Sequence, residues 1–319
     1  MKNHKLILFV FINLISSTSY EQQIYKVGFG SCLHQNKPQE IWNAIEKENI
    51  QSFFFLGDNV YGDDETEDLE KLKKAYEIQK TKLPNWLNNI EIMSIWDDHD
   101  FGENDAGKDY KLKEKSKEIF FNFWNSYGAE FNVENQTYFS KLVEIKSKKI
   151  LFLGLDTRYY RTELIGNSGS YIKNDDVKAT VLGKDQWNWL EDEFSKEVDF
   201  IVLGSSIQVL PLDHGWEKWG NFEYERNRLI KLIENSGINC LIISGDRHRA
   251  GIYKYEKIYE ITSSSLNLSF SKNEEIDKYS IEKTYPEENF GILEFNDTFC
   301  NFSIHNNKGE FVYERKLYY

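Results

Sequence analysis

The pattern of apolar and polar positions divides the chain into alternating strands and helices. Short apolar runs end in glycine or polar residues, which is typical of strands buried in a sheet. These runs lie at residues 25–30, 52–56, 91–96, 150–155, 200–203 and 240–243. Between them, apolar residues spaced three and four apart predict helices. The predicted helices are residues 38–48, 66–80, 108–126, 184–197 and 221–235.

The pattern changes after residue 251, where short strands dominate. The predicted strands there are residues 252–255, 258–262, 290–295, 300–305 and 310–316. Residues 306–309, Asn-Asn-Lys-Gly, fit a hairpin turn, and residues 267–289 are expected to form a long surface loop. Alternating strands and helices followed by an antiparallel tail predict a layered α/β fold, with helices outside packed sheets.

The first residues have the pattern of a secretory signal peptide. A basic start precedes an apolar run at residues 6–15, and small residues follow up to Ser19. That run is shorter than the roughly 20 residues that a membrane span needs. We therefore predict a signal peptide at 1–19, a single domain at 20–319, no transmembrane segment after cleavage, and a secreted or periplasmic protein.

The charge balance argues against broad nucleic-acid binding. The chain has 39 Lys and Arg residues against 52 Asp and Glu residues, a net charge of −13, which repels a phosphate backbone. A phosphate substrate would need bound cations to reverse the local field. The three cysteines leave at least one thiol unpaired, and Cys240 and Cys300 fit either a disulfide or two small buried side chains.

Polar side chains recur just after the carboxyl ends of the apolar runs, which is the edge where open α/β sheets bind ligands. They supply a thiol, a phenol, carboxylates, an amide and imidazoles, which are metal ligands. The set is Cys32, Asp58, Tyr61, Asp97, Asp98, His99, Asp100, Asn104, Arg158, Asp246 and His248.

Two motifs carry most of the acidic candidates. Residues 96–100, Trp-Asp-Asp-His-Asp, crowd three carboxylates, which repel one another unless a cation lies between them. A solvated acidic turn is the alternative, and Asn104 would add an amide oxygen. Asp58, in Gly-Asp-Asn-Val-Tyr-Gly, can bridge two metals, with Tyr61 binding one of them; a plain Gly-Asp turn is the alternative.

The remaining motifs have competing interpretations. Asp246 and His248 are two residues apart on a loop and can reach one metal pair, or they form a turn with a surface histidine. Cys32 fits a metal thiolate, a nucleophile or a buried thiol, of which the thiolate agrees best with the other ligands. Arg158 can bind phosphate oxygens bidentately or pair with Asp156.

Taken in order, these motifs resemble the PhoD-like alkaline phosphatases, a family of calcineurin-like metallophosphoesterases. The resemblance runs from about residue 27 to residue 250 and implies a four-layer fold, two β-sheets packed face to face and flanked by helices. It also implies phosphomonoesterase or phosphodiesterase activity on a small phosphate ester. Its motifs are residues 30–32, 57–62, 96–100 with 104–105, 155–158 and 245–248.

The resemblance also implies metals and roles. Iron(III) is expected at Cys32, Asp58, Tyr61 and His248, and calcium at Asp58 together with a set of oxygen ligands. Mn²⁺ or Zn²⁺ are alternative ions, and thiolate and phenolate independently suit a transition ion. The calcium ligands beyond Asp58 are Asp98, Asn104 and Asp246.

In the expected mechanism, a hydroxide activated by the metals attacks phosphorus in line with the leaving alcohol. Asp58 bridges the metals, and His99 stabilises the transition state or protonates the leaving oxygen. Arg158 steadies an equatorial phosphate oxygen.

Two departures from the family are visible. Relatives often carry an N-terminal β-domain, which we expect to be absent here, and many have Glu where Asp100 stands.

Two other functions remain open on the sequence alone. One is a hydrolase that uses Cys32 as nucleophile, which would survive a chelator and be inactivated by a thiol alkylator. The other is a non-catalytic secreted calcium-binding or carbohydrate-binding protein on the same fold, which metal would stabilise without any phosphate release.

Overall fold

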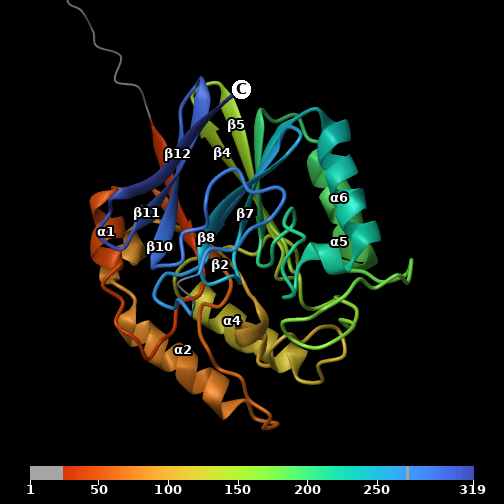
Figure 1. Cartoon of the computed structure of the whole chain (residues 1–319). Helices are drawn as coiled ribbons and strands as arrows, with labels where there is room; N and C mark the ends of the chain where they lie inside the picture. The colour runs from red at the N-terminus through yellow and green to blue at the C-terminus, as the bar shows by residue number, and fades with distance from the viewer. Residues whose placement is uncertain (1–23, 271–272) are drawn as a thin grey trace, which may run out of the picture.

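Two six-stranded sheets pack face to face between two layers of helices in the computed structural model (Figure 1). The structure describes residues 24–270 and 273–319, so the predicted signal peptide at 1–19 lies outside the described residues. The prediction of a layered α/β fold with helices outside packed sheets is confirmed. None of the helices in the described part of the chain is long and apolar enough to cross a membrane.

The first sheet combines three parallel strands with the antiparallel tail of the chain. Its strand order is β12-β11-β10-β1-β2-β3, with β1, β2 and β3 parallel and β10 antiparallel to β1. The strands are β1 (Tyr25–Gly30), β2 (Ser52–Leu56), β3 (Glu91–Ile95), β10 (Asn289–Phe295), β11 (Phe299–Asn306) and β12 (Phe311–Tyr318).

The second sheet has the order β4-β5-β6-β7-β9-β8. Its four central strands are parallel, and the edge strands β4 and β8 are antiparallel to their neighbours. The strands are β4 (Phe139–Ile145), β5 (Lys148–Gly154), β6 (Phe200–Ser205), β7 (Asn239–Ser244), β8 (Ala250–Tyr255) and β9 (Ile258–Ser263).

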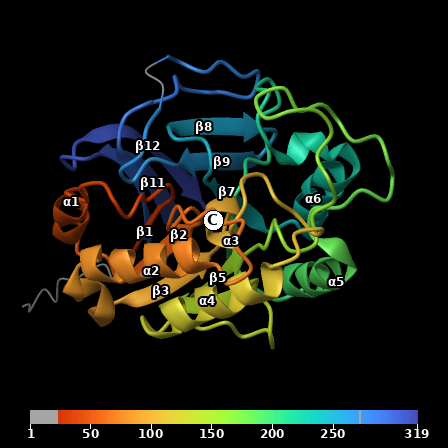
Figure 2. The same ribbon diagram turned by 90° about the horizontal axis from the view of Figure 1, so that it is seen from below.

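Helices cover the outer faces of both sheets (Figures 1 and 2). The first sheet packs against α1 (Trp42–Lys47), α2 (Glu70–Lys82) and α4 (Lys113–Asn125), and the second against α5 (Gly183–Phe194) and α6 (Glu223–Ser236). Shorter elements are the helix α3 (Asp98–Phe101) and the 3₁₀ turns η1 (Asn85–Asn89) and η2 (Trp219–Asn221).

The central strands are mostly apolar because both of their faces are buried. Successive side chains of a strand point to opposite faces. In β2, Phe53 and Phe55 therefore pack outward against Trp42 of α1, with ring centroids 5.3 and 5.9 Å from the indole. Phe54 and Leu56 point the other way, into the core between the two sheets.

The structure departs from the predicted elements in places where the sequence pattern is weak. The edge strand β4 was not predicted, because two of its seven residues are exposed and three more are only partly buried. The predicted loop at 267–289 includes bridges from Tyr285 to Ala250 and from Ser280 to Tyr253. The disulfide alternative for Cys240 and Cys300 is wrong, since both are free thiols in different core clusters.

Glu225 of α6 joins α6 to α5 through one buried carboxylate. Its Oε2 accepts hydrogen bonds from the Trp187 indole at 2.6 Å, the Thr180 hydroxyl at 2.8 Å and the Val181 amide at 3.0 Å. Thr180 and Val181 lie in the loop that leads into α5, and Trp187 lies in α5 itself. The carboxylate therefore fixes α6 to α5 and to the loop before it.

We predict that Glu225→Ala lowers the free energy of unfolding by about 3 kcal/mol, because it leaves several buried donors without an acceptor. Chemical denaturation measures the change. Glu234→Ala is the matched control, since Glu234 is an exposed residue of the same helix and should shift stability by less than about 0.5 kcal/mol. Equal stability of the two variants would contradict the assigned role of Glu225.

Candidate metal centre

The loops that follow the parallel strands of both sheets meet at one edge of the molecule, which faces the viewer in Figure 2. Two backbone hydrogen bonds fix this meeting. The Ser31 amide, just after β1, donates to the Ser263 carbonyl at the end of β9, with N···O 3.1 Å. The Leu33 amide donates to the Asp58 carbonyl at 2.8 Å. Loops distant in the sequence therefore become neighbours.

Several residues in these loops have a left-handed backbone although they are not glycine. Their φ angles are 59° at Cys32, 50° at Asp58, 66° at Asp246 and 52° at His248. Such angles are uncommon for residues with a side chain and cluster at functional sites. The tertiary fold thus stabilises an unfavourable backbone at the loop positions that the sequence singled out.

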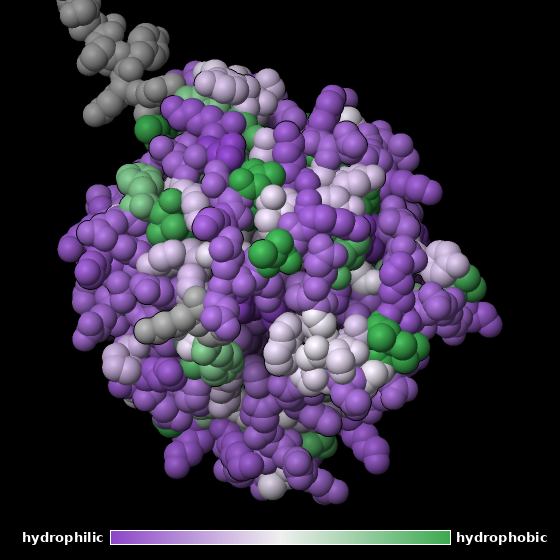
Figure 3. Space-filling model, viewed as in Figure 1, coloured by the Kyte–Doolittle hydropathy of each residue, from purple (hydrophilic) through white to green (hydrophobic). Residues whose placement is uncertain are grey.

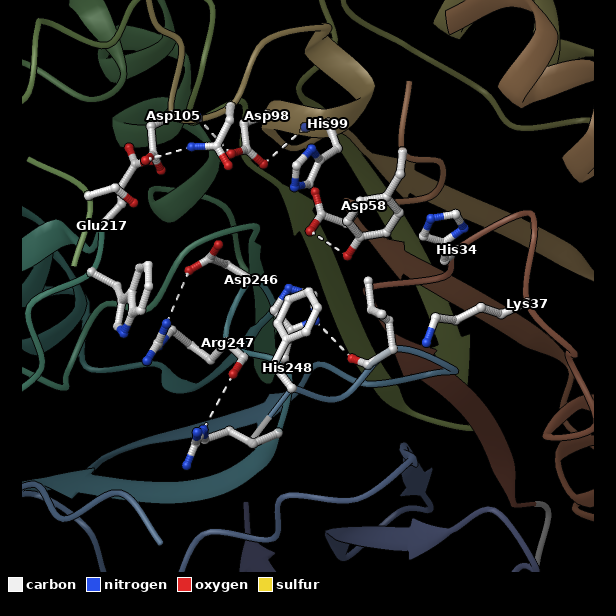
Figure 4. Close-up of a pocket in the computed structure, with 17 residues that line it drawn as sticks. His34, Lys37, Asp58, Asp98, His99, Asp105, Glu217, Asp246, Arg247 and His248 are labelled. Atoms are coloured by element: carbon white, nitrogen blue, oxygen red, sulfur yellow. Dashed lines mark hydrogen bonds and ion pairs between the residues drawn. The ribbon is translucent and has the colours of Figure 1, made fainter. Parts of the chain in front are cut away.

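A cavity of about 760 Å³ opens between the loops (Figure 4). Most of the predicted site residues line it, together with cationic and aromatic residues described below. Figure 3, in the view of Figure 1, shows that this side of the molecule is largely hydrophilic with scattered hydrophobic residues. The predicted residues in the cavity wall are Asp58, Tyr61, Asp98, His99, Asn104, Asp246 and His248.

One group of potential ligands surrounds the inner side of Asp58. The ligand atoms of Cys32, Asp58 and His248 all lie within 4.8 Å of one another. Asp58 Oδ2 lies 3.5 Å from the Cys32 sulfur and accepts a hydrogen bond from the Tyr61 hydroxyl at 3.1 Å. Thiol, phenol, imidazole and carboxylate thus converge, a donor set that suits a transition metal.

His248 is prepared to act as a neutral ligand. Its ring Nδ1 lies 2.8 Å from the Leu268 carbonyl oxygen, so Nδ1 carries the proton and Nε2 keeps a lone pair. Burial lowers the pKa of His248 to about 4. A neutral imidazole held by a backbone carbonyl is the usual state of a metal-bound histidine.

A second group lies on the outer side of Asp58. Ligand atoms of Asp58, Asp98 and His99 also lie within 4.8 Å of one another. The Asp98 carboxylate accepts hydrogen bonds from the amides of His99 at 2.9 Å and Asp105 at 2.8 Å, which fix its orientation. Burial acts to raise the pKa of Asp98, but His99 and Arg158 nearby lower it below its usual value. Asp58 therefore belongs to both groups.

Asp246 and Asn104 line the same cavity but belong to neither group of closely spaced ligand atoms. Burial raises the pKa of Asp246 to about 6, while Arg247 opposes this shift. The Asn104 amide donates to Asp105 Oδ2 at 2.8 Å. Both side chains bring oxygen atoms to the cavity that Asp98 also lines.

The other two carboxylates of the 97–100 motif serve the scaffold. Asp100 accepts hydrogen bonds from the Tyr76 hydroxyl at 2.8 Å and the amides of Asn59 and Asp97 at 3.2 and 3.0 Å. Together with Asp97 it forms a capping box that starts α3. Asp100 thereby fixes the loop that follows β2 to the loop that follows β3, and this positions Asp58 beside Asp98.

Arg158 does not occupy the position expected of a phosphate ligand. Its side chain is 0% exposed and does not line the cavity. The guanidinium contacts the Asp97 carboxylate through Nε, at 2.6 Å, and Nη2, and it contacts Glu217 through Nη1 at 2.5 Å. The guanidinium thus forms buried ion pairs with Asp97 and Glu217, whereas Arg158 donates to Asp156 only through its backbone amide.

The residues present fit multivalent cations. Asp58 Oδ1 is buried and has no hydrogen-bond partner among the described residues. Burial, and then the neighbouring Cys32 and Asp98, raise the pKa of Asp58 well above its usual value. Burial likewise raises the pKa values of Cys32 and Tyr61. Such a crowd of acidic groups becomes favourable in its ionised form only against positive charge.

Sequence reasoning missed residues in the cavity wall and next to it. Asp63 lies 2.6 Å from His99 Nδ1 and orients the ring, and Glu217 lines the wall while binding Arg158. The acidic run at 63–65 was a weak signal for Asp63. Nothing in the sequence distinguishes Glu217 from the many other glutamates of the chain.

Comparison with known proteins agrees with this architecture. A family model described as PhoD-like phosphatase matches residues 148–312, whereas no curated protein sequence matches the chain. The solved structure of PhoD covers 92% of this chain and 68% of its own, with TM-score 0.67 and 15% identity.

Other solved structures share the fold at similarly low identity. GAP50, described as the anchor in the inner membrane complex of Plasmodium, covers 92% of this chain and 89% of its own, with TM-score 0.64 and 14% identity. A dimetal phosphatase from Danio rerio covers 92% and 99%, with TM-score 0.61 and 10% identity. These likenesses establish the fold and do not by themselves assign an activity.

The matched family model spans more than half of the chain, including Asp246 and His248, and the solved PhoD has the same fold. The resemblance predicted from the sequence motifs is confirmed, and the chain belongs to the PhoD-like phosphatase family.

Proposed function

We propose that this chain is a metal-dependent phosphoesterase that hydrolyses small phosphate monoesters or diesters. One observation carries the proposal: Asp58 belongs at once to a group with Cys32 and His248 and to a group with Asp98 and His99. A carboxylate shared by two ligand groups is the arrangement that a two-metal hydrolase needs. Membership of the PhoD-like family supports the same activity.

The chemistry of the donors suggests which ions each group would hold. Cys32, Tyr61, His248 and Asp58 would hold iron(III), since thiolate, phenolate and imidazole favour transition ions. Mn²⁺ or Zn²⁺ would be the alternatives. Oxygen ligands favour calcium, and those in the cavity are Asp58, Asp98, Asn104 and Asp246.

In the proposed reaction, a water oxygen bonds to phosphorus, the bond from phosphorus to the leaving alcohol breaks, and the alcohol oxygen takes up a proton. The ions would supply the positive charge that polarises the phosphoryl group and the water. Asp58 orients the two ion sites relative to each other. His99 is held at Nδ1 by Asp63, 2.6 Å away, so Nε2 is available to stabilise or protonate the leaving oxygen.

The geometry disfavours Cys32 as a nucleophile. Its thiol is 0% exposed, lies outside the cavity wall, and has a pKa raised by burial. A nucleophilic cysteine needs the opposite properties, namely access and a lowered pKa.

The sequence at 1–19 supports export as a secreted or periplasmic protein.

We expect Asp58→Ala to lower kcat/KM on an aryl phosphate by about 10³-fold or more, because the metal charge it organises contributes several kcal/mol. Release of nitrophenol from 4-nitrophenyl phosphate measures the rate. Asp185→Ala, which changes an exposed aspartate of α5, is the control and should keep the wild-type rate. Near wild-type activity in Asp58→Ala would reject the proposed function.

For Arg158 we expect a loss of stability rather than a specific loss of substrate binding. Arg158→Met removes the cation between Asp97 and Glu217 and should cost about 3–5 kcal/mol of unfolding free energy, as breaking a buried ion pair does. Arg228→Met removes an exposed pair with Glu191 and should cost less than about 1 kcal/mol. An Arg158→Met protein with unchanged stability and a greatly raised KM would restore the role of phosphate ligand.

A further inference from the structure

One wall of the cavity carries cationic side chains that the proposed hydrolysis does not use. Arg247 and Arg249 leave the loop between β7 and β8, and both line the cavity. They are only 6% and 8% exposed, so their guanidinium groups are held in place. In Figure 4, Arg247 lies below Asp246, and Lys37 reaches toward the cavity from the opposite side.

The two arginines of this wall share one acidic partner, Glu275. Arg247 Nη2 lies 2.7 Å from Glu275 Oε2, and Arg249 Nε lies 3.9 Å from the same oxygen. Arg249 Nη1 otherwise donates to the Asn273 carbonyl at 3.0 Å. The Glu275 carboxylate is therefore shared by two guanidinium groups, and Asp246 is a further carboxylate within 4.0 Å of Arg247.

A third cation adds to the same region. Lys218 Nζ donates to the carbonyls of His214 and Trp216 at 2.5 and 3.0 Å, which leaves its charge without a carboxylate in contact among the described residues. The nearby Asp277 carboxylate accepts hydrogen bonds from backbone amides, including that of Leu212 at 2.6 Å. Lys218 thus lies near Arg247, and the carboxylates that act on it are Asp277, Glu275 and Asp213.

Two neighbouring groups, Lys218 and His214, have lowered pKa values. Burial, and then Arg247, lower the pKa of Lys218 to about 8. Burial and the same arginine lower the pKa of His214 well below its usual value. Arg247 Nε is buried and has no hydrogen-bond partner among the described residues. A buried guanidinium with an unused donor beside a cavity is suited to an anionic ligand.

Asp246 is the second carboxylate near Arg247. Its Oδ2 lies 4.0 Å from Arg247 Nη1, but under the proposed function its charge is directed to a metal ion. The Arg247 guanidinium also lies 5.7 Å from the ring of Trp216, whose side chain is 47% exposed at the cavity. The wall therefore offers cationic donors beside an accessible aromatic surface.

We propose that Arg247 and Arg249 bind a second phosphate group on the substrate, so that the preferred substrates are phosphate esters whose alcohol carries a further phosphate. This inference rests on the proposed function, because it places the reacting phosphate at the metal centre and the second one against the arginines. Asp246 and Arg247 are adjacent in the chain, which puts the two anion sites side by side.

The test compares two series of alkyl phosphate monoesters with chains of two to six carbons. The far end of the chain carries a hydroxyl in one series and a phosphonate, which is not hydrolysed, in the other. Wild-type enzyme should prefer the phosphonate-terminated ester by about tenfold or more in kcat/KM at the best chain length. Arg249→Gln should bring that ratio close to one. Arg249 is chosen because it does not contact Asp246.

Two matched variants locate the effect. Arg228→Gln changes an exposed arginine of α6, and Lys37→Gln changes the cation on the opposite wall; both should keep the preference. A ratio that survives Arg249→Gln, or one that disappears in Lys37→Gln and not in Arg249→Gln, overturns the assignment.

A binding measurement separates this inference from the proposed function. If the hydroxyl-terminated esters are not cleaved at all, the proposed function fails, and calorimetric titration with an alkane bisphosphonate and the matching monophosphonate still tests the arginine site. Arg249→Gln should weaken the bisphosphonate about tenfold and leave the monophosphonate unchanged. Equal effects on the two ligands, or no effect on either, reject a site for a second phosphate.

Discussion

The repulsion among buried acidic groups around Asp58 is the constraint on which the rest of the site depends. Asp58, Asp98 and the Cys32 thiol are all buried within a few ångströms, and burial with mutual repulsion raises the pKa of Asp58. Such a cluster destabilises a fold unless positive charge compensates it. The scaffold holds it together with rigid sheets on both sides and with loops in a left-handed backbone conformation.

Polar contacts from neighbouring residues hold the cluster in place. Asp100 links the loops after β2 and β3, and Arg158 links Asp97 to Glu217. Asp63 orients His99, and the Leu268 carbonyl orients His248. Each of these contacts fixes the direction of a neighbouring side chain, which is what a preorganised site requires. The loop that carries Asp246 and His248 also carries Arg247 and Arg249, so the proposed anion site and the candidate metal ligands share one scaffold.

Much of the fold follows from the sequence, because most of the parallel strands contain apolar runs that are followed by glycine or polar residues. Those ends also located Asp58, Asp98 and His248, since the carboxyl ends of parallel strands meet at one edge. The direction in which a side chain points could not be predicted from the sequence. Arg158 follows a strand as the other candidate residues do, yet its side chain turns into the core toward Asp97. Glu217 was missed because it comes from a loop without periodicity, and β4 because an edge strand is only half-buried.

The central claim is that Cys32, Asp58 and Tyr61 bind a metal ion together. Elemental analysis of the purified protein, combined with a visible absorption spectrum, tests it most directly. The account predicts bound iron with calcium, a phenolate-to-iron absorption band that Tyr61→Phe abolishes, and loss of the metals in Asp58→Ala. A protein that carries no stoichiometric metal after growth with an ample supply, and whose spectrum is the same in Tyr61→Phe, would contradict it.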